Sequence, residues 1–341
     1  MYLTDLADTP VLASLRMGRS PPSSMETVSI VIPVYRGART IGPLVEKLER
    51  EVGSVRPLEI VLVNDGSPDD SARVCRELAR TRPHLRFVNL SRNFGEHNAV
   101  MAGLNHATGG VAVIMDDDCQ NPPEEVMKLV AKVEEGFDVV WSRYEQKKHS
   151  AFRNFGSKVN DKAATLLLSK PADLYLSSFK ALNRFVIDEV TKYRGPYPYL
   201  DGLILRVTTN YATVLCAHVS REQGRSGYTL KKLVSLWLNM FTSFSILPLR
   251  LTSLAGVLVA LAGVVLAVVF LVERLMNPGL QQGWASLIVT LLVVSGIQLI
   301  GIGMIGEYLG RLFLMDSGRP QFTVRERVNC TKTEQQVHAP R

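Results

Sequence analysis

The sequence predicts an α/β fold, in which a mostly parallel β-sheet is covered by helices on both faces and is followed by membrane-embedded helices. Two observations lead to this prediction. Between residues 28 and 115, short apolar runs rich in β-branched residues alternate with stretches whose apolar residues recur every three or four positions. Later in the 341-residue chain, residues 251–272 and 284–306 contain no charged side chain. A stretch of that length spans roughly 33 Å as a helix, which is enough to cross a bilayer.

The alternation gives each element in order. We expect strands over residues 28–35, 58–65, 85–91 and 110–115. The first of these is a continuous apolar run rich in β-branched residues, as in a strand buried on both faces. Helices are expected over 41–52, 67–81 and 97–107, with Ser67 as N-cap of the second and Pro68 at its first position. In such sheets ligands bind outside the carboxyl ends of the strands.

Charge places the membrane segments. Lys and Arg are frequent before the first apolar segment and after the second, whereas the loop between them, "ERLMNPGLQQG", contains only Arg274. By the positive-inside rule we expect both termini to be cytoplasmic and the chain to be multi-pass. The net charge of +7 then indicates attraction to anionic lipid headgroups. We expect no nucleic-acid partner, because the chain has no basic helix or aromatic-basic motif.

The remaining composition is consistent with a cytosolic domain. Residues 1–25 contain "SPPSS" and no long apolar region, so they predict a disordered leader without a signal peptide. The four cysteines lack CxxC spacing, which fits reduced thiols and argues against a zinc site.

Acidic residues follow the expected strands, and the two common glycine-rich phosphate-binding motifs are absent. The first strand is followed by "VYRGART" and not by GxGxxG, and GxxxxGK[ST] occurs nowhere. Asp65 follows the second strand, and "MDDDCQNPPEE" follows the fourth. In an extended segment Asp116, Asp118 and Gln120 share one face and offer three oxygens, which suits Mg²⁺ or Mn²⁺ completed by substrate phosphates. An EF-hand is excluded because Asn121 stands at its glycine position. The alternative is that the acids only cap the helix beginning near Pro122.

Four motifs carry a family resemblance. "VSIVIPVY", "VNDGSPDDS", "NLSRNFGEHNAVMAG" and "DDDCQNPPEE" resemble the inverting family 2 glycosyltransferases of GT-A fold. More narrowly, they resemble the polyprenyl-phosphate glycosyltransferases, which include the dolichol-phosphate mannose synthases. The branch that transfers 4-deoxy-4-formamido-L-arabinose to undecaprenyl phosphate is most similar, because it shares "NPPEE" (121–125), "PLR" (248–250) and "GEYxGR" (306–311). The resemblance covers residues 27–325.

The resemblance implies roles for individual residues. Pro33 and Tyr35 correspond to the wall that holds the nucleotide base, and Asp65 corresponds to an acid that contacts the nucleotide. Asp116 and Asp118 match the DxD pair, with Asp118 among the catalytic residues, and Gln120 helps to bind the metal. In the acceptor segment, the positions that hold the lipid phosphate are Arg143, Arg153 and Ser157. The alternative for these two arginines is that they are solvated or face headgroups.

The chain departs from the family pattern at three places. Asp173 matches a family Asp with a base-like or orienting role, but its spacing to the following Phe-Lys pair is one residue longer. Lys180 replaces the Arg of that pair, and Gly227 replaces a Lys whose contact could come from Lys231 or Lys232. A phosphate monoester is already ionised near neutral pH, so no strong base is required and Asp173 serves to orient or to cap.

These observations predict an enzyme that moves one sugar from a nucleotide-sugar, with a UDP-sugar as the expected donor, to undecaprenyl or another polyprenyl phosphate. The reaction would take place on the cytoplasmic face of the bacterial inner membrane, for cell-envelope glycan or lipid A modification. The expected divisions are a leader (1–25), a GT-A domain (26–228), an interfacial helix (229–250), a two-helix hairpin (251–309) and a cytoplasmic tail (310–341). The interfacial helix could instead extend the first span. A homo-oligomer, a tetramer by resemblance, is also expected.

Two other functions compete with this prediction. A processive polysaccharide synthase of the same fold would carry a Q-x-x-R-W element, but none of the three Trp follows an Arg, and two spans make a poor channel. A membrane-tethered nucleotide-sugar-binding protein without activity is opposed by the intact DxDxQ, and the altered spacing at Asp173 keeps it open.

Overall fold

A mixed sheet lies at the centre of the computed structural model, which describes residues 26–144, 174–219, 247–276, 283–318 and 320–330. Eight strands form it in the order β7-β5-β6-β4-β1-β2-β3-β8. The strands are β1 (Val28–Val34), β2 (Leu58–Asn64), β3 (Leu85–Leu90), β4 (Val111–Ile114), β5 (Val139–Tyr144), β6 (Lys180–Asn183), β7 (Tyr211–Cys216) and β8 (Val324–Val328). The pairs of β1 with β2 and β4, of β2 with β3 and of β5 with β7 are parallel. The expected mostly parallel α/β sheet is confirmed.

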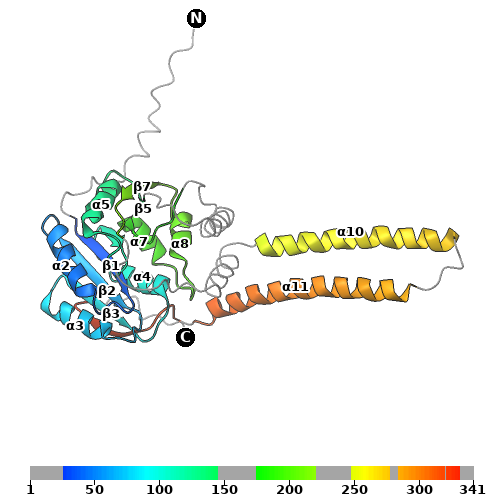
Figure 1. Cartoon of the computed structure of the whole chain (residues 1–341), viewed down its shortest axis with the longest axis horizontal. Coiled ribbons are helices and arrows are strands. Elements are labelled where there is room, and N and C mark those ends of the chain that lie inside the picture. The colour runs from blue at the N-terminus through cyan, green and yellow to red at the C-terminus, as the bar shows by residue number, and fades with distance from the viewer. Residues whose placement is uncertain (1–25, 145–173, 220–246, 277–282, 319, 331–341) are drawn as a thin grey trace, which may run out of the picture.

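Helices cover both faces of this sheet (Figure 1). One face packs against α2 (Ile41–Glu51), α3 (Ser71–Thr81) and α5 (Val126–Glu134), and the other against α4 (Glu96–Leu104), α7 (Arg184–Val190) and α8 (Leu200–Val207). β1 shows why its sequence is apolar throughout: Ile30 and Ile32 enter the first core, whereas Val31 enters the second. Because side chains alternate between faces, a strand between two helix layers must be apolar at every position.

The start of α3 corrects one detail. The helix begins at Ser71, not near Pro68, and Asp69 accepts hydrogen bonds from the backbone N–H and hydroxyl of Ser71. Ser67 is not an N-cap, because its hydroxyl donates to the carbonyl of Val34 and accepts from the N–H of Arg36. The turn after β2 is therefore used to hold the loop after β1. The expected helix near Pro122 is present as a short 3-10 turn, Pro123–Glu125, that leads into α5.

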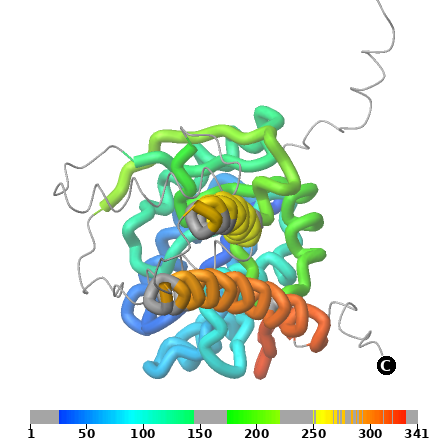
Figure 2. Tube along the Cα trace, turned by 90° about the vertical axis from the view of Figure 1, so that its right-hand side faces the viewer, coloured from blue at the N-terminus to red at the C-terminus, as the bar shows by residue number. Residues whose placement is uncertain are grey.

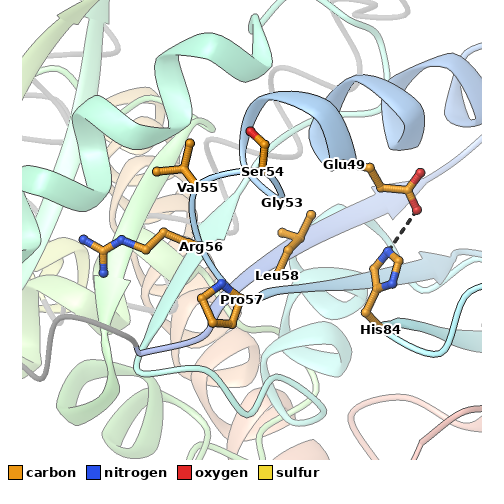
Figure 3. A pocket seen from close by; sticks show the side chains of 8 residues that line it. All are labelled: Glu49, Gly53, Ser54, Val55, Arg56, Pro57, Leu58 and His84. Carbon is orange, nitrogen blue, oxygen red and sulfur yellow. Dashed lines mark hydrogen bonds and ion pairs between the residues drawn. The ribbon is translucent and has the colours of Figure 1, made fainter.

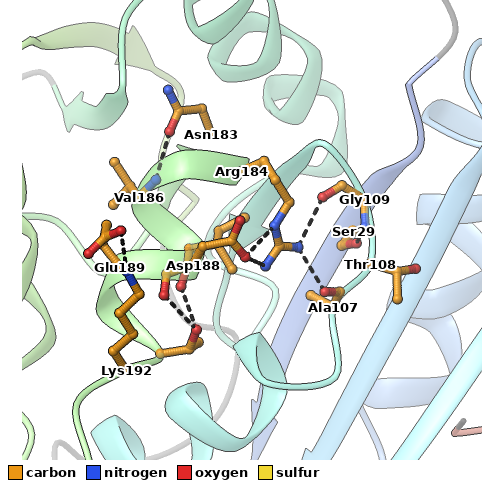
Figure 4. A network of polar contacts seen from close by, with 12 residues as sticks. Ser29, Ala107, Thr108, Gly109, Asn183, Arg184, Val186, Asp188, Glu189 and Lys192 are labelled. Carbon is orange, nitrogen blue, oxygen red and sulfur yellow. Dashed lines mark hydrogen bonds and ion pairs between the residues drawn. The ribbon is translucent and has the colours of Figure 1, made fainter. Parts of the chain in front are cut away.

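Beyond β4 the chain turns antiparallel, because β6 pairs in that sense with both β4 and β5. Asn183 at the end of β6 caps α7 by accepting the N–H of Val186 at 2.9 Å. Arg184 then donates to the carbonyls of Ala107 and Gly109 in the turn before β4 (Figure 4). These bonds lie at the amino end of β4. They therefore hold the start of α7 at the end of the sheet opposite to the acids, which follow the carboxyl end of β4.

The strand β8 comes from the segment that we expected to be a cytoplasmic tail. It pairs antiparallel with β3, and Arg76 on α3 binds Glu326 through two hydrogen bonds of 2.8 and 2.7 Å. Part of the expected cytoplasmic tail thus belongs to the domain, because residues 324–328 follow both long helices and complete the sheet. The other expected boundaries stay predictions. β8 covers an edge of the sheet that would otherwise present unpaired backbone groups.

Asn329 fixes the end of β8. Its side-chain amide donates to the carbonyls of Ala79, Arg82 and Leu85, and its own backbone is left-handed with φ 56°. We expect Asn329→Ala to lower the free energy of unfolding by about 1–3 kcal/mol, because several buried carbonyls lose a donor and Ala tolerates this φ poorly. Denaturant unfolding of the solubilised protein measures this value. Asn329→Asp keeps the tolerance of φ but removes the donor, so a loss with Ala and none with Asp would contradict the assignment.

Two long helices, α10 (Leu247–Met276) and α11 (Trp284–Asp316), extend away from the domain side by side (Figure 1), and Figure 2 views them almost along their axes. Most of their described apolar side chains are exposed, including Leu254, Val265 and Ile302. Among the described residues, Val293–Asp316 is long and apolar enough to cross a membrane, whereas the apolar stretch Thr252–Leu266 of α10 is shorter. One expected crossing thus meets the length test, and the second stays a prediction. Residues 1–25 and 229–246, the expected leader and most of the expected interfacial helix, lie outside the described residues.

Candidate active site

The carboxyl ends of β1 and β4 form a topological switch point. From β1 the chain proceeds to β2 and β3 on one side, whereas β4 lies on the other side of β1. In sheets of this kind ligands bind outside the carboxyl ends of the two neighbouring strands, and we call this expected binding region the crevice. Tyr35 follows β1 at this point, and the acids Asp116 to Asp118 follow β4. The structure therefore brings the predicted base wall and the predicted metal platform to adjacent strand ends.

Pro33 lies in β1 just beyond the point at which the pairing with β4 ends. Val31 is the last residue of β1 paired with β4, and its carbonyl accepts the N–H of Met115 at 3.1 Å. Two residues further along, Pro33 has its nitrogen on the same side of the strand, where β4 has ended. A buried central strand tolerates Pro only where no ladder bond is lost, and this is such a place.

The acid loop is held by groups from distant parts of the chain. Asp116 accepts a hydrogen bond of 2.7 Å from the hydroxyl of Ser178, which lies two residues before β6. Asp118 accepts the backbone N–H of Gln120 at 3.1 Å, and Cys119 between them is left-handed with φ 59°. The turn at Cys119 thus folds Gln120 back towards Asp118.

Gln120 also contacts the segment that follows β7. Its carbonyl accepts the N–H of Val219 at 2.9 Å, and its side-chain amide donates to the carbonyl of Val219 at 3.4 Å. The neighbouring His218 lies against Tyr144, with ring centroids 4.3 Å apart, and the Tyr144 hydroxyl donates to Asn121 at 2.7 Å. Sequence reasoning did not identify these supporting residues, because they come from three separate strand ends and no local motif marks them.

Negative charge is concentrated here. Burial, together with the charges of Asp116 and Asp118, raises the pKa of Asp117 to about 7 against an opposing hydrogen bond from Tyr35. Burial and the same two aspartates also raise the pKa of Glu96, at the start of α4, to about 7, although Lys180 opposes this shift. A cation bound beside these carboxylates would favour their ionised form and offset their mutual repulsion.

This chemistry fits a hard divalent cation. No group of three or more His, Cys, Asp or Glu side chains in the described ranges is arranged to hold a metal by itself. As predicted ligands, Asp116, Asp118 and Gln120 would supply two carboxylates and one amide, and phosphate oxygens of a substrate would complete the coordination, as is usual for Mg²⁺ and Mn²⁺. The donor set thus favours a metal that arrives with a diphosphate.

Asp65 has a structural contact that was not expected. Its carboxylate accepts the backbone N–H groups of Phe94 at 2.7 Å and Gly95 at 2.9 Å, and its side chain is buried. Burial raises the pKa of Asp65, and these two bonds oppose the increase. Asp65 therefore positions the loop before α4, and its contact with a nucleotide remains a prediction.

The predicted acceptor residues are only partly in view. Arg143 lies at the exposed carboxyl end of β5, opposite Leu215 of β7. Arg153, Ser157 and Asp173 lie outside the described residues.

Lys180 is buried, and its ammonium group contacts a carboxylate inside the domain. It is 3% exposed at the start of β6 and forms an ion pair with Asp201 of α8, which also accepts the indole N–H of Trp141 at 3.0 Å. A buried ammonium needs such a partner. Lys180, which stands where the resemblance predicts an Arg, is thus paired with Asp201 from α8.

A second depression lies at the opposite end of the sheet, where β2 and β3 begin. It is lined by residues 53–58 together with Glu49 and His84, which are joined by a contact of 2.9 Å (Figure 3). Ligands of parallel sheets bind at the carboxyl ends, so this depression is not part of the candidate active site.

Comparison with known proteins identifies the family of the chain. The model of the family "Glycosyl transferase family 2" matches residues 29–191, which include the switch point and the acid loop. The undecaprenyl-phosphate 4-deoxy-4-formamido-L-arabinose transferase of Proteus mirabilis is 35% identical over 89% of this chain and 95% of its own length. The enzyme of that name from Yersinia enterocolitica is 33% identical over 92% of this chain and 98% of its own length.

Among solved structures, Mycobacterium tuberculosis glucosyl-3-phosphoglycerate synthase matches 64% of this chain and 78% of its own, with a TM-score of 0.48 and 18% identity. That likeness is too distant to indicate shared chemistry. The relatives, by contrast, match along almost their whole length. The matched family model and the full-length relatives lead to one conclusion: the chain, with its carboxylate loop at the switch point of a mixed sheet, belongs to glycosyl transferase family 2 and is a glycosyltransferase.

Proposed function

We propose that this glycosyltransferase moves a single sugar, with inversion, from a nucleotide-sugar to undecaprenyl phosphate or a similar polyprenyl phosphate at the cytoplasmic face of a bacterial inner membrane. The expected donor is a UDP-sugar. The observation that carries the proposal is that the Asp116–Gln120 loop and two long apolar helices belong to one chain. Relatives named for transfer to undecaprenyl phosphate match both parts, over 89% and 92% of this chain.

The arrangement of the helices supports access to a lipid acceptor. α10 begins next to the domain and α11 ends next to it, so the two antiparallel helices project from the same side of the domain (Figure 1). We propose that both cross the bilayer as a hairpin, with the basic segments on either side of it in the cytoplasm. The active site would then lie on the side where the acceptor phosphate is exposed.

The residues of the chain divide the work between two substrates. Tyr35, whose side chain is 46% exposed beside the crevice, offers a ring face to the nucleotide base. Asp116, Asp118 and Gln120 would hold Mg²⁺ or Mn²⁺, and Ser178 orients Asp116 for this task. The bound cation would neutralise the departing diphosphate.

Acceptor binding is assigned to the arginines. Arg143, with Arg153 and Ser157, would hold the lipid phosphate through charge-assisted hydrogen bonds in line with the anomeric carbon. An ionised phosphate is a competent nucleophile without a strong base, so Asp173 would orient the reactants. The catalytic contribution then comes mainly from positioning and electrostatics.

The direct test is a transfer assay with the full chain in detergent or membranes. Undecaprenyl phosphate is mixed with each of a panel of radiolabelled nucleotide-sugars, with Mg²⁺ or Mn²⁺, and the lipid products are separated. We expect one labelled product carrying a single sugar, and we expect its loss when EDTA is added. A polymeric product would favour a processive synthase, and nucleotide binding without any glycolipid would favour an inactive binding protein.

A further inference from the structure

Asp117 lies between the two predicted metal ligands but faces the other way, towards the loop after β1. Its Oδ2 atom accepts the backbone N–H of Tyr35 at 3.1 Å. Tyr35 and Asp117 follow the two strands that flank the switch point. This hydrogen bond therefore crosses the crevice and joins the loop on the base side to the loop on the metal side.

The loop after β1 is shaped to receive this carboxylate. Gly37 is buried, and a Cβ atom there would lie 2.3 Å from Oδ2 of Asp117, far inside van der Waals contact. Arg36 between Tyr35 and Gly37 is left-handed with φ 62°, so the chain turns sharply between the Tyr35 N–H, which donates to Asp117, and Gly37, which lies close to the same carboxylate. The absence of a side chain at residue 37 is thus a steric requirement of the contact.

Side chains from two directions hold this loop. The N–H of Arg36 donates to Ser67 at 3.3 Å, and the N–H of Ala38 donates to Asp69 at 3.4 Å, both in the turn after β2. The N–H of Tyr35 alone among these three is directed to the acid loop. The turn after β2 fixes the loop to its own half of the sheet, and Asp117 fixes its distance from the other half.

We propose that Asp117 is a positioning residue that sets the separation between the metal platform and the base-binding loop. A nucleoside diphosphate must reach from Tyr35 to a cation on Asp116 and Asp118, so its affinity depends on that separation. The inference rests on the proposed function for the identity of the ligand. It adds a role for Asp117 in coupling metal binding to nucleotide binding.

A competing explanation is that Asp117 acts only through its charge, by attracting the cation. Two substitutions separate the explanations. Asp117→Asn removes the charge but keeps an oxygen that accepts the Tyr35 N–H, whereas Asp117→Ala removes both. Gly37→Ala alters no charge at all, yet its Cβ would lie 2.3 Å from Oδ2 of Asp117, so the carboxylate and the acid loop that carries it must shift.

The experiment uses the full chain and measures two affinities for each variant: that for Mn²⁺ alone, and that for UDP with and without saturating Mn²⁺. We expect Asp117→Ala and Gly37→Ala each to lower the Mn²⁺-dependent UDP affinity about tenfold, the size of one lost charge-assisted hydrogen bond. Asp117→Asn should lower it less than about threefold. Gly37→Ala should also weaken binding of Mn²⁺ alone by about threefold, because the acid loop moves.

The two sites should also be non-additive. Once Asp117 is Ala, the added Cβ at residue 37 meets no carboxylate, so the double variant should bind UDP about as weakly as either single variant. Thermal unfolding checks that each variant is folded.

The proposal is overturned if Gly37→Ala binds both ligands as the wild type does, if Asp117→Asn is as weak as Asp117→Ala, or if the two effects add. Failure of the proposed function would look different. The wild type would not bind UDP, while Mn²⁺ binding would still respond to Gly37→Ala only when Asp117 is present.

Discussion

Replacing Asp118 by Asn is expected to lower the rate of sugar transfer about a hundredfold or more while the protein stays folded. Asp118 has an intermediate exposure at the rim of the crevice, and its described hydrogen bond comes from the backbone of its own turn. The substitution keeps the size of the side chain and a hydrogen-bond acceptor, but an amide oxygen binds Mg²⁺ or Mn²⁺ more weakly than a carboxylate. Turnover of labelled glycolipid and the melting temperature together measure the two parts of this prediction.

A matched control is Asp70→Asn. Asp70 precedes α3, its side chain is 72% exposed, and it forms a surface ion pair with Arg73. Such pairs contribute little, so both turnover and stability should remain close to those of the wild type. Normal turnover of the Asp118 variant would refute the assignment of the metal platform, and equal losses in both variants would point to a general effect of charge.

The second large effect concerns stability. Asp201→Ala is expected to lower the free energy of unfolding by about 3–5 kcal/mol, because it leaves the buried ammonium of Lys180 without a counter-ion. The indole N–H of Trp141 loses its acceptor in the same variant. The surface pair of Arg184 with Asp188 provides the control, since Asp188 is 57% exposed and Asp188→Ala should cost less than about 1 kcal/mol.

A double variant tests whether the buried charge is the cause. Replacing Lys180 by Met and Asp201 by Leu removes both charges and keeps apolar volume, so it should be less destabilised than Asp201→Ala. Denaturant titration of the purified protein gives all three values. If Asp201→Ala and Asp188→Ala are equally mild, Lys180 does not depend on Asp201 in the folded protein.

Much of the parallel half of the fold could be predicted from local sequence. β1 to β4 can be predicted because each is a short, mainly apolar run, and α2 because its apolar residues recur at helical spacing. β8 was missed although "VRERV" alternates in the manner of a half-exposed strand. Its position after two apolar helices favoured a tail, and nothing local shows that it returns to β3.

In the candidate active site, too, local sequence pointed to single residues but not to the contacts between distant segments. Asp116, Asp118 and Gln120 are predicted because alternate residues of an extended segment share a face, but this premise is wrong. Residues 117–119 form a turn with Cys119 left-handed, and the three side chains as metal ligands stay a prediction. The contact of Tyr35 with Asp117 could not be predicted, since the residues are 82 positions apart and the chain between them forms three further strands. The pairing of Ser178 with Asp116 spans 62 positions, and likewise has no local signal.

The position of β8 has a consequence for biogenesis. Arg76 and Glu326 are 250 residues apart, so the ribosome completes α10 and α11 before β8 can reach β3. During synthesis the nascent domain therefore keeps an open sheet edge until both long helices have been made, which is a state prone to aggregation. Final folding of the domain follows the synthesis of α11, and a chain that stops short of residue 324 should keep this edge unpaired.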